Sequence, residues 1–446
     1  MKIFLKKKYF FVIAFSLLNV FLIFYDTISP IVISGLLFVE FLCVYILYRR
    51  YNSSYFSLLY TCIFFIPLSY ISILGTSTSS FPISWYHLII IILSLRTIFL
   101  GKMNRNTALF LFLCILFLFY GFANVLITGT GFDGYKQVLM LLLFMFSFVI
   151  GSNVSKSNVH TKTMIFTFIC TCITLSLQII LQKFLLDFLG LSVGNVSLMG
   201  RGRIAFSGLL SDFSFATLYL ACGVFLLFIS YVRYKSISTT TFIVFSSVLV
   251  FSSLIVSSRT GLFALIVTIV LYILYFLFKY EIVNKRLIIV LAFGLLGGFY
   301  IVIKLISARG GQSLLDGSGR IQDYLTALNY WKASPFIGIG FGMDNVVTNY
   351  NLTVPHNFFI QYLCQGGIIG LFIIIIPFVY FIATYFNKAN DYKWLFILIF
   401  VGAMVIPDIT SSRFLTFAII LICICKEKKI SQRRLTTPNL DLCSQL

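Results

Sequence analysis

Four arginines and one histidine stand at the ends of apolar segments, where they could act on an anionic molecule. They are Arg201, Arg203, Arg259, Arg320 and His356. An arginine presents a planar fork of donors that matches phosphate oxygens, and it stays charged at any relevant pH. A histidine can take a proton from a hydroxyl near neutral pH. Together these residue types predict transfer chemistry on a phosphate-bearing substrate.

The four arginines also have a simpler explanation, because an arginine at a membrane boundary can reach lipid headgroups. That explanation competes seriously for Arg320 and accounts most easily for Arg201. It is weaker for Arg259, which lies in SSRTG (residues 257–261), where two apolar segments meet with almost no connection. We therefore favour a functional role for Arg259.

The other polar candidates have structural alternatives of their own. His356 starts an apolar segment just before Asn357, so, taken alone, bonding to a nearby carbonyl carries the same weight as a role as general base. Beside Arg320 and the glycines at 338–342, the general-base role is favoured. Asp212 could orient Arg203, but a carboxylate at a helix start more simply acts as a cap. His87 lies beside two aromatic residues, which is typical of an aromatic belt. Arg201, Asp212 and Asn357 are therefore secondary candidates.

These residues must be positioned by membrane-spanning helices. The chain has 446 residues, of which 60% are hydrophobic and only 10% charged, with a mean hydropathy of +1.03. No soluble fold could bury so much apolar surface. The net charge of +20 is spread between the apolar segments, which argues against a nucleic-acid partner. We therefore predict an all-α, polytopic integral membrane protein with one transmembrane domain over residues 1–446.

The apolar segments predict about fourteen spans, within a range of about 12–14, at roughly 20 residues a span. They are centred near residues 17, 38, 64, 91, 117, 145, 174, 220, 248, 270, 296, 372, 402 and 419. Lysine and arginine concentrate in alternate connections, which places those connections in the cytoplasm. We therefore expect both termini in the cytoplasm and the long polar segment 307–355 on the outer side.

The segment 307–355 has its own predicted structure. Apolar residues recur at helical spacing after Arg320, which predicts an amphipathic helix on the membrane surface that ends before Pro335. Gly338, Gly340 and Gly342 follow, and they would let the backbone turn tightly or approach a ligand.

Several kinds of site are not predicted. No cluster of residues has metal-ligand spacing, and no glycine-rich nucleotide loop occurs on the cytoplasmic side. The cysteines fall almost entirely within apolar segments, where they are small packing residues. We therefore expect neither a metal nor another cofactor. The energy for a transfer reaction would then have to come from the substrate on the outer side of the membrane.

The order of these parts resembles a known group. An arginine-containing loop with FSGLLSD, then SSRTG, then SPFIGIGFG and HNFFIQYL with GGIIGL is similar to the O-antigen polymerase and ligase superfamily. The similarity covers roughly residues 200–375. Related chains often carry Asp-Pro-Asn where this chain has Asp212-Phe213-Ser214, so a role carried over to Asp212 is in question.

The resemblance implies an integral-membrane glycosyltransferase of GT-C-like architecture that needs no metal. It would act on undecaprenyl-pyrophosphate oligosaccharides at the outer (periplasmic) face of the bacterial inner membrane. The arginines thought to bind pyrophosphate map onto Arg203, Arg259 and Arg320, and the family histidine maps onto His356. The expected partners are the lipid-linked oligosaccharide, membrane lipids and a chain-length regulator protein.

Three functions fit this pattern. The favoured one is an O-antigen polymerase that joins lipid-linked repeat units. A ligase that transfers finished glycan to lipid A-core would need the same donor site and differ only in its acceptor. A lipid-linked oligosaccharide flippase would instead be expected to show charged residues near mid-span and a two-fold repeat of spans. The sequence concentrates its arginines at one face, beside a single large loop, and no repeat is evident.

Overall fold

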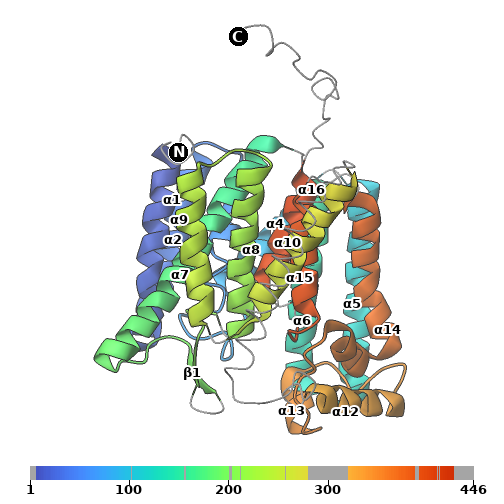
Figure 1. The fold of residues 1–446 in the computed structure, drawn as a ribbon. Coiled ribbons are helices and arrows are strands. Elements are labelled where there is room, and N and C mark those ends of the chain that lie inside the picture. Colours follow the sequence, from blue (N-terminus) through green and yellow to red (C-terminus); the bar gives the residue numbers. More distant parts are fainter. Residues whose placement is uncertain are drawn as a thin grey trace, which may run out of the picture.

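The computed structural model is a bundle of apolar helices with small additions at one end (Figure 1). The structure describes residues 7–101, 103–154, 157–199, 203–210, 212–256, 258–279, 320–386, 391–408, 410 and 412–425. α1 begins and α16 ends at the end of the bundle that is uppermost in Figure 1, called here the upper end. The strands, α12 and α13 mark the lower end.

The elements alternate between long helices and short ones. The first half contains α1 (Lys7–Leu18), η1 (Asn19–Thr27), α2 (Pro30–Arg49), α3 (Ser54–Phe64), α4 (Trp85–Leu100), α5 (Arg105–Thr128), α6 (Gly131–Asn153) and α7 (Asn158–Leu189). Then come β1 (Val196–Met199), β2 (Arg203–Phe206), α8 (Phe213–Val232), α9 (Thr239–Ile255) and α10 (Thr260–Lys279). The remainder is α12 (Arg320–Ala333), α13 (Met343–Thr348), α14 (Phe358–Phe381), η4 (Ile382–Phe386), α15 (Lys393–Ala403) and α16 (Arg413–Ile424).

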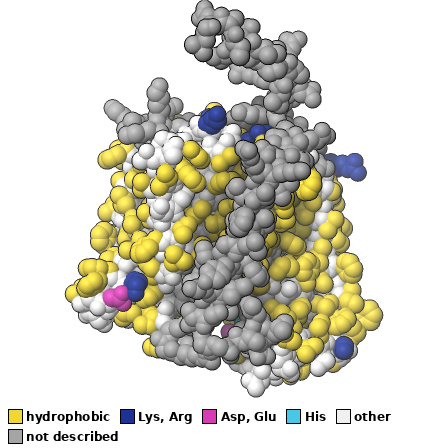
Figure 2. Space-filling view, in the orientation of Figure 1, with side chains coloured by type: hydrophobic (Ala, Val, Ile, Leu, Met, Phe, Trp, Pro, Cys, Tyr) yellow, Lys and Arg dark blue, Asp and Glu magenta, His cyan; other side chains and the backbone are white. Residues whose placement is uncertain are grey.

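Eight of the described helical segments are long and apolar enough to cross a membrane, and five further apolar helices are shorter. This confirms a polytopic helical membrane protein. Every predicted span centre except residue 296 falls within a described helix, and residue 296 lies outside the described residues. The count of fourteen spans stays a prediction. The face shown in Figure 2 is largely hydrophobic between its ends, with several basic side chains at the upper edge.

Two helical hairpins, α3–α4 and α15–α16, are short. α3 and α15 have 11 residues each, a rise of about 16 Å against a hydrocarbon core of about 30 Å. The residues that join the two helices of each hairpin, 65–84 and 404–412, are largely buried or half-buried where they are described. Non-helical backbone at such depth is tolerated where protein surrounds it or where it lines a cavity. These two connections are therefore expected to be enclosed by other helices or to line a cavity.

The prediction of an all-helical protein misses a small hairpin at the lower end. β1 pairs with β2 in antiparallel register, from Val196 opposite Phe206 to Met199 opposite Arg203. Successive residues of each strand face opposite sides of this two-stranded sheet. The hairpin projects below the bundle (Figure 1), and its chain leads directly into α8.

The predicted helix after Arg320 is confirmed, because α12 runs from Arg320 to Ala333 and ends before Pro335. Residues 338–342, called here the glycine segment, follow α12 and pack against the bundle. The amides of Ile339 and Gly340 donate to the carbonyls of Cys364 and Gln365 in α14, each at 2.9 Å. This contact is with the protein's own α14, and the approach of the glycines to a ligand stays a prediction.

Backbone geometry explains why glycine is needed at this contact. Gly340 has a φ of 100°, and a Cβ there would overlap Thr128. Gly367 interrupts α14 with φ 59° and ψ −168°, and a Cβ there would overlap the Phe336 carbonyl. Neither conformation is easily reached by another residue. The segment and the break in α14 therefore fit each other, and together they hold α12 over the start of α14.

Buried amide side chains complete this contact. Asn124 of α5 donates to the Ile337 carbonyl at 2.8 Å and accepts from the Phe341 amide at 3.0 Å. Gln137 of α6 donates to Gln365 of α14 at 3.0 Å. Because a buried polar group is costly unless it is hydrogen-bonded, these bonds fix the register of α5, α6 and α14 against the segment.

Candidate functional site

Arg259 lies where the sequence predicted, in the short connection between α9 and α10. Its neighbour Ser258 is buried, and the Ser258 hydroxyl lies 3.4 Å from the hydroxyls of both Ser214 and Thr217. A Cβ at Gly261 would overlap the Thr217 carbonyl, so α10 starts in close contact with α8. Arg259 is half-buried, and its neighbours Ser258 and Gly261 contact the first turns of α8.

Asp212 caps the start of α8. Its carboxylate accepts from the amides of Ser214 at 2.5 Å and Phe215 at 3.0 Å. This confirms the capping role that the sequence favoured for Asp212. The carboxylate is thereby engaged with its own helix.

A second arginine, Arg413, begins a helix that packs on the first turns of α8. It is the first residue of α16, and the next residue, Phe414, packs on Phe215 and Tyr219 of α8 with ring centres 6.4 and 5.6 Å apart. The guanidinium carbon of Arg413 lies 4.3 Å from the centre of the Tyr70 ring, a favourable cation–π distance. Arg259 and Arg413 thus lie near the same two turns of α8.

A small cavity of about 40 Å³ lies between the two short hairpins. Its polar lining comes from Tyr86 and His87 of α4, Thr416 and Arg413 of α16, and Thr410. His87 is buried, and its Nδ1 pairs with Ser84 at the start of α4. The expectation of an aromatic-belt position for His87 is therefore wrong, because the connection before α4 places this ring inside the bundle.

The connection before α16 also reaches α14. The Tyr362 hydroxyl donates to the Asp408 carboxylate at 2.6 Å and lies 2.6 Å from the Thr410 hydroxyl. The Asp408 amide donates to Gln361 at 2.6 Å. Asp408 therefore links α14 to the stretch that carries Arg413.

His356 and Asn357 stand at the start of α14. The Asn357 side chain caps this helix, accepting from the amides of Phe359 and Ile360 at 3.0 and 3.2 Å. Its amide nitrogen lies 3.4 Å from the Met404 carbonyl, in the connection before α16. The half-buried His356 is thus adjacent to the same connection.

α12 lies over the start of α14. The Tyr324 hydroxyl donates to the carbonyl of His356 at 2.9 Å. Arg320 begins α12 one turn before Tyr324, and residues four apart share a helix face. The backbone therefore brings the first turn of α12, with Arg320, to the start of α14; the Arg320 side chain lies outside the described part of the structure.

The structure describes Arg203 only in part and does not describe Arg201. Arg203 begins β2 opposite Met199, at the far end of the hairpin from α8. Its side chain, and all of Arg201, lie outside the described residues. A shared site of Arg203 with Arg259 stays a prediction.

The sequence did not single out Arg413, Asp408 or His87 as members of one region. Arg413 begins α16, Asp408 precedes it, and His87 lies in the first turn of α4. The signal available in the sequence was an ionisable residue next to an interrupted apolar run. The described starts of α4, α8, α10 and α16 are joined through the contacts above. A helix start carries partial positive charge, so this region, with Arg259 and Arg413, is suited to an anionic group.

The fold is that of a polytopic helical membrane protein, and the contacts above bring the connections that carry Arg259 and Arg413 near the first turns of α8. Residues 242–375 match the family model described as O-antigen ligase. The match confirms the resemblance to the O-antigen polymerase and ligase superfamily. It includes Arg259, Arg320, His356 and Asn357 and applies equally to polymerases and ligases. A search of curated proteins gave no match.

Proposed function

We propose that this protein is an O-antigen polymerase of the bacterial inner membrane. It would join undecaprenyl-pyrophosphate-linked repeat units on the outer side of that membrane, with both of its own termini in the cytoplasm. Arg259 would bind the diphosphate of the donor, and Arg320 and Arg203 would be further binding residues. Membrane lipids and a chain-length regulator are the other expected partners.

The observation that carries the proposal is the position of Arg259. It lies between two apolar helices, half-buried and next to the Ser258–Ser214–Thr217 hydroxyl contacts. An arginine needed only for headgroup contact would be expected to extend into the boundary region instead. A bidentate donor fixed beside two helix starts is well suited to a diphosphate.

The reaction would be a single displacement at the anomeric carbon of the growing glycan. A hydroxyl of the incoming repeat unit attacks that carbon, and its proton passes to His356. The bond between the anomeric carbon and the phosphate oxygen breaks, and undecaprenyl pyrophosphate leaves with the electron pair. Arg259 stabilises the negative charge that develops on the leaving oxygens.

A ligase is the second candidate, favoured by the description of the matching family. Its donor chemistry would be the same, and its acceptor would be lipid A-core. We prefer the polymerase because of the large predicted number of spans and the Phe- and Tyr-rich helices. Neither candidate needs a nucleotide, because the lipid-linked diphosphate supplies the energy of transfer.

A gene deletion tests polymerase against ligase. Loss of a polymerase should leave single repeat units on the lipid core, because ligation of one unit still proceeds. Loss of a ligase should leave a core without any repeat unit. Electrophoresis of the lipopolysaccharide distinguishes these outcomes, and bare core in the deletion strain would overturn the polymerase in favour of the ligase.

A further inference from the structure

An open pocket of about 380 Å³ lies where α3 begins and where α4 and α6 end. Its volume is within the range of pockets that bind small ligands. Ser157, shortly after α6, donates its amide to the Ile424 carbonyl at the end of α16, so the pocket is at the upper end. The residues that line it, called here the α3–α4–α6 pocket, are Tyr55, Phe56, Arg96, Thr97, Leu100, Gly101, Asn153 and Val154.

Arg96 is the charged residue of this pocket. It is half-buried, and its Nη1 donates to the Ser54 hydroxyl at 2.8 Å, at the start of α3. Its guanidinium carbon lies 6.0 Å from the centre of the Tyr55 ring, which also lines the pocket. These two contacts fix the Arg96 side chain against α3, at the wall of the pocket.

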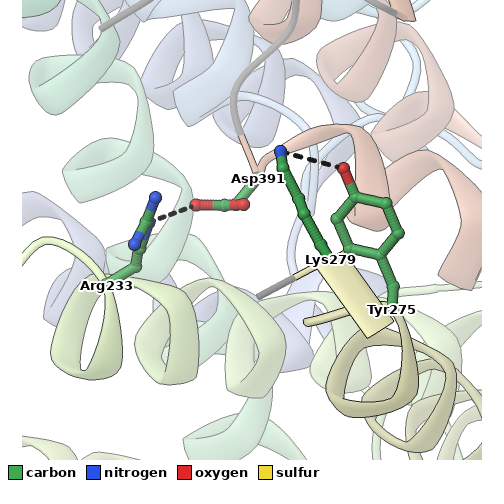
Figure 3. Close-up of polar contacts among 4 residues, drawn as sticks. All are labelled: Arg233, Tyr275, Lys279 and Asp391. Atoms are coloured by element: carbon green, nitrogen blue, oxygen red, sulfur yellow. Dashed lines mark hydrogen bonds and ion pairs between the residues drawn. The ribbon is translucent and has the colours of Figure 1, made fainter. Parts of the chain in front are cut away.

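Arg96 has no counter-charge within the described part of the chain. A guanidinium has five N–H donors, and the bond to Ser54 uses one of them. No described carboxylate forms an ion pair with Arg96. Arg233, at the same end of the bundle, differs, because its Nε lies 2.9 Å from the Asp391 carboxylate (Figure 3). An anion in the pocket would give Arg96 the kind of acceptor that Arg233 already has.

The side-chain amide of Asn153 is a second donor in the pocket. A Cβ at Gly101 would overlap the Asn153 amide nitrogen, so this side chain lies across the end of α4. Asn153 is half-buried, and its side chain makes no hydrogen bond to any residue that the structure describes. Its two N–H groups can donate to an oxygen acceptor. Arg96 and Asn153 therefore offer donors to one pocket from two helices.

The surroundings of the pocket identify the anion. Phe99 and Leu100 are 76% and 79% exposed, as expected of apolar side chains that face lipid, and Leu100 also lines the pocket. Arg96 is about one turn before the end of α4, so it lies at the boundary between apolar and polar surroundings. Phospholipid phosphates occupy this boundary, and basic pockets between helices bind anionic headgroups there. We propose that the α3–α4–α6 pocket binds the phosphate of an anionic phospholipid headgroup through Arg96 and Asn153.

Binding there would connect the ends of three helices. The α3–α4 hairpin is one of the two short hairpins, and α4 carries His87 in its first turn. A headgroup held by Arg96 and Asn153 would join the end of α4 to the end of α6. With the termini in the cytoplasm, as proposed above, this ligand would come from the cytoplasmic leaflet. It would stabilise the fold without taking part in the transfer of glycan.

The experiment compares melting temperatures of the full-length protein in phosphatidylglycerol and phosphatidylcholine nanodiscs. We expect the wild type to melt about 3 °C or more higher in phosphatidylglycerol. Arg96→Gln should lose this difference. Asn153→Asp keeps the size of the side chain and adds a negative charge that competes with the phosphate for Arg96, so it should also lose the difference.

The control is Arg50→Gln. Arg50 directly follows α2 at the same end of the bundle and is exposed, and it does not line the pocket. The substitution removes the same charge as Arg96→Gln, so it accounts for any general attraction between a basic protein and an anionic membrane. Arg50→Gln should keep the full difference between the two lipids.

Four results would overturn the proposal. The first is an equal melting temperature of the wild type in the two lipids. The second is a full difference in Arg96→Gln or, should that variant not fold, in Asn153→Asp. The third is an equal loss in Arg50→Gln, which would assign the effect to general surface charge. The fourth is an equal rise, abolished by Arg96→Gln, when inorganic phosphate is added to the phosphatidylcholine nanodiscs, which would assign the site to free phosphate. Melting temperature requires no glycan substrate, so failure here is separable from failure of the proposed activity.

Discussion

Replacing Arg259 with lysine should reduce glycan elongation by about 100-fold or more. Lysine keeps the charge but not the planar fork that contacts two phosphate oxygens at once. The connection between α9 and α10 is too short to let a lysine move freely to a new position. The length distribution of glycan on lipopolysaccharide, in a deletion strain that carries the variant, measures the effect.

A matched substitution separates this effect from a general loss of basic side chains. Arg50 directly follows α2 at the upper end and is exposed. Arg50→Lys should therefore leave the glycan profile unchanged. Full activity of Arg259→Lys, at an equal amount of protein in the membrane, would contradict the bidentate contact with phosphate.

Replacing His356 with alanine should also lower elongation by about 100-fold or more, because the acceptor hydroxyl would lose its proton acceptor. The residue does not cap α14, since Asn357 does so. The contact with Tyr324 uses the His356 backbone carbonyl. The helix start and the cover by α12 should therefore survive the substitution, and the protein should be inserted at normal levels.

A glutamine at position 356 distinguishes a base from a positioning group. Glutamine can donate and accept hydrogen bonds but takes no proton at neutral pH. If His356 is the base, His356→Gln should be as inactive as His356→Ala. Near-normal elongation by His356→Gln would mean that the side chain only positions the acceptor.

The long apolar helices and the ends of α12 could be predicted from the sequence because each depends on local pattern. Proline after Ala333 and helical spacing after Arg320 were sufficient for α12. The junction at Arg259 was equally clear, since an apolar helix of normal length on each side leaves no room for a loop. Asp212 was correctly expected to cap α8, because capping is decided within one helical turn.

The grouping of His87, Asp408 and Arg413 could not be predicted in the same way. It depends on two connections far apart in the chain, before α4 and before α16, that meet inside the bundle. A hydropathy pattern places the apolar runs but not which interruptions face each other. The hairpin of β1 and β2 was missed because only four residues in each strand carry the signal.

The glycine segment could be interpreted only in part. Glycines at positions 338, 340 and 342 predict unusual backbone, and the structure gives all three a positive φ. What they contact is decided by Gly367 and the amides of Asn124 and Gln137 on other helices. These residues are spread over more than 240 positions of the chain, and no local pattern connects them.

Elongation by the purified protein tests the central claim most directly. The wild type would be placed in liposomes with one purified undecaprenyl-pyrophosphate-linked repeat unit and no nucleotide sugar. A ladder of longer lipid-linked glycans, with release of undecaprenyl pyrophosphate in proportion to the bonds formed, is the predicted result. Movement of the lipid-linked unit across the bilayer without any longer product would contradict the polymerase and support a transporter.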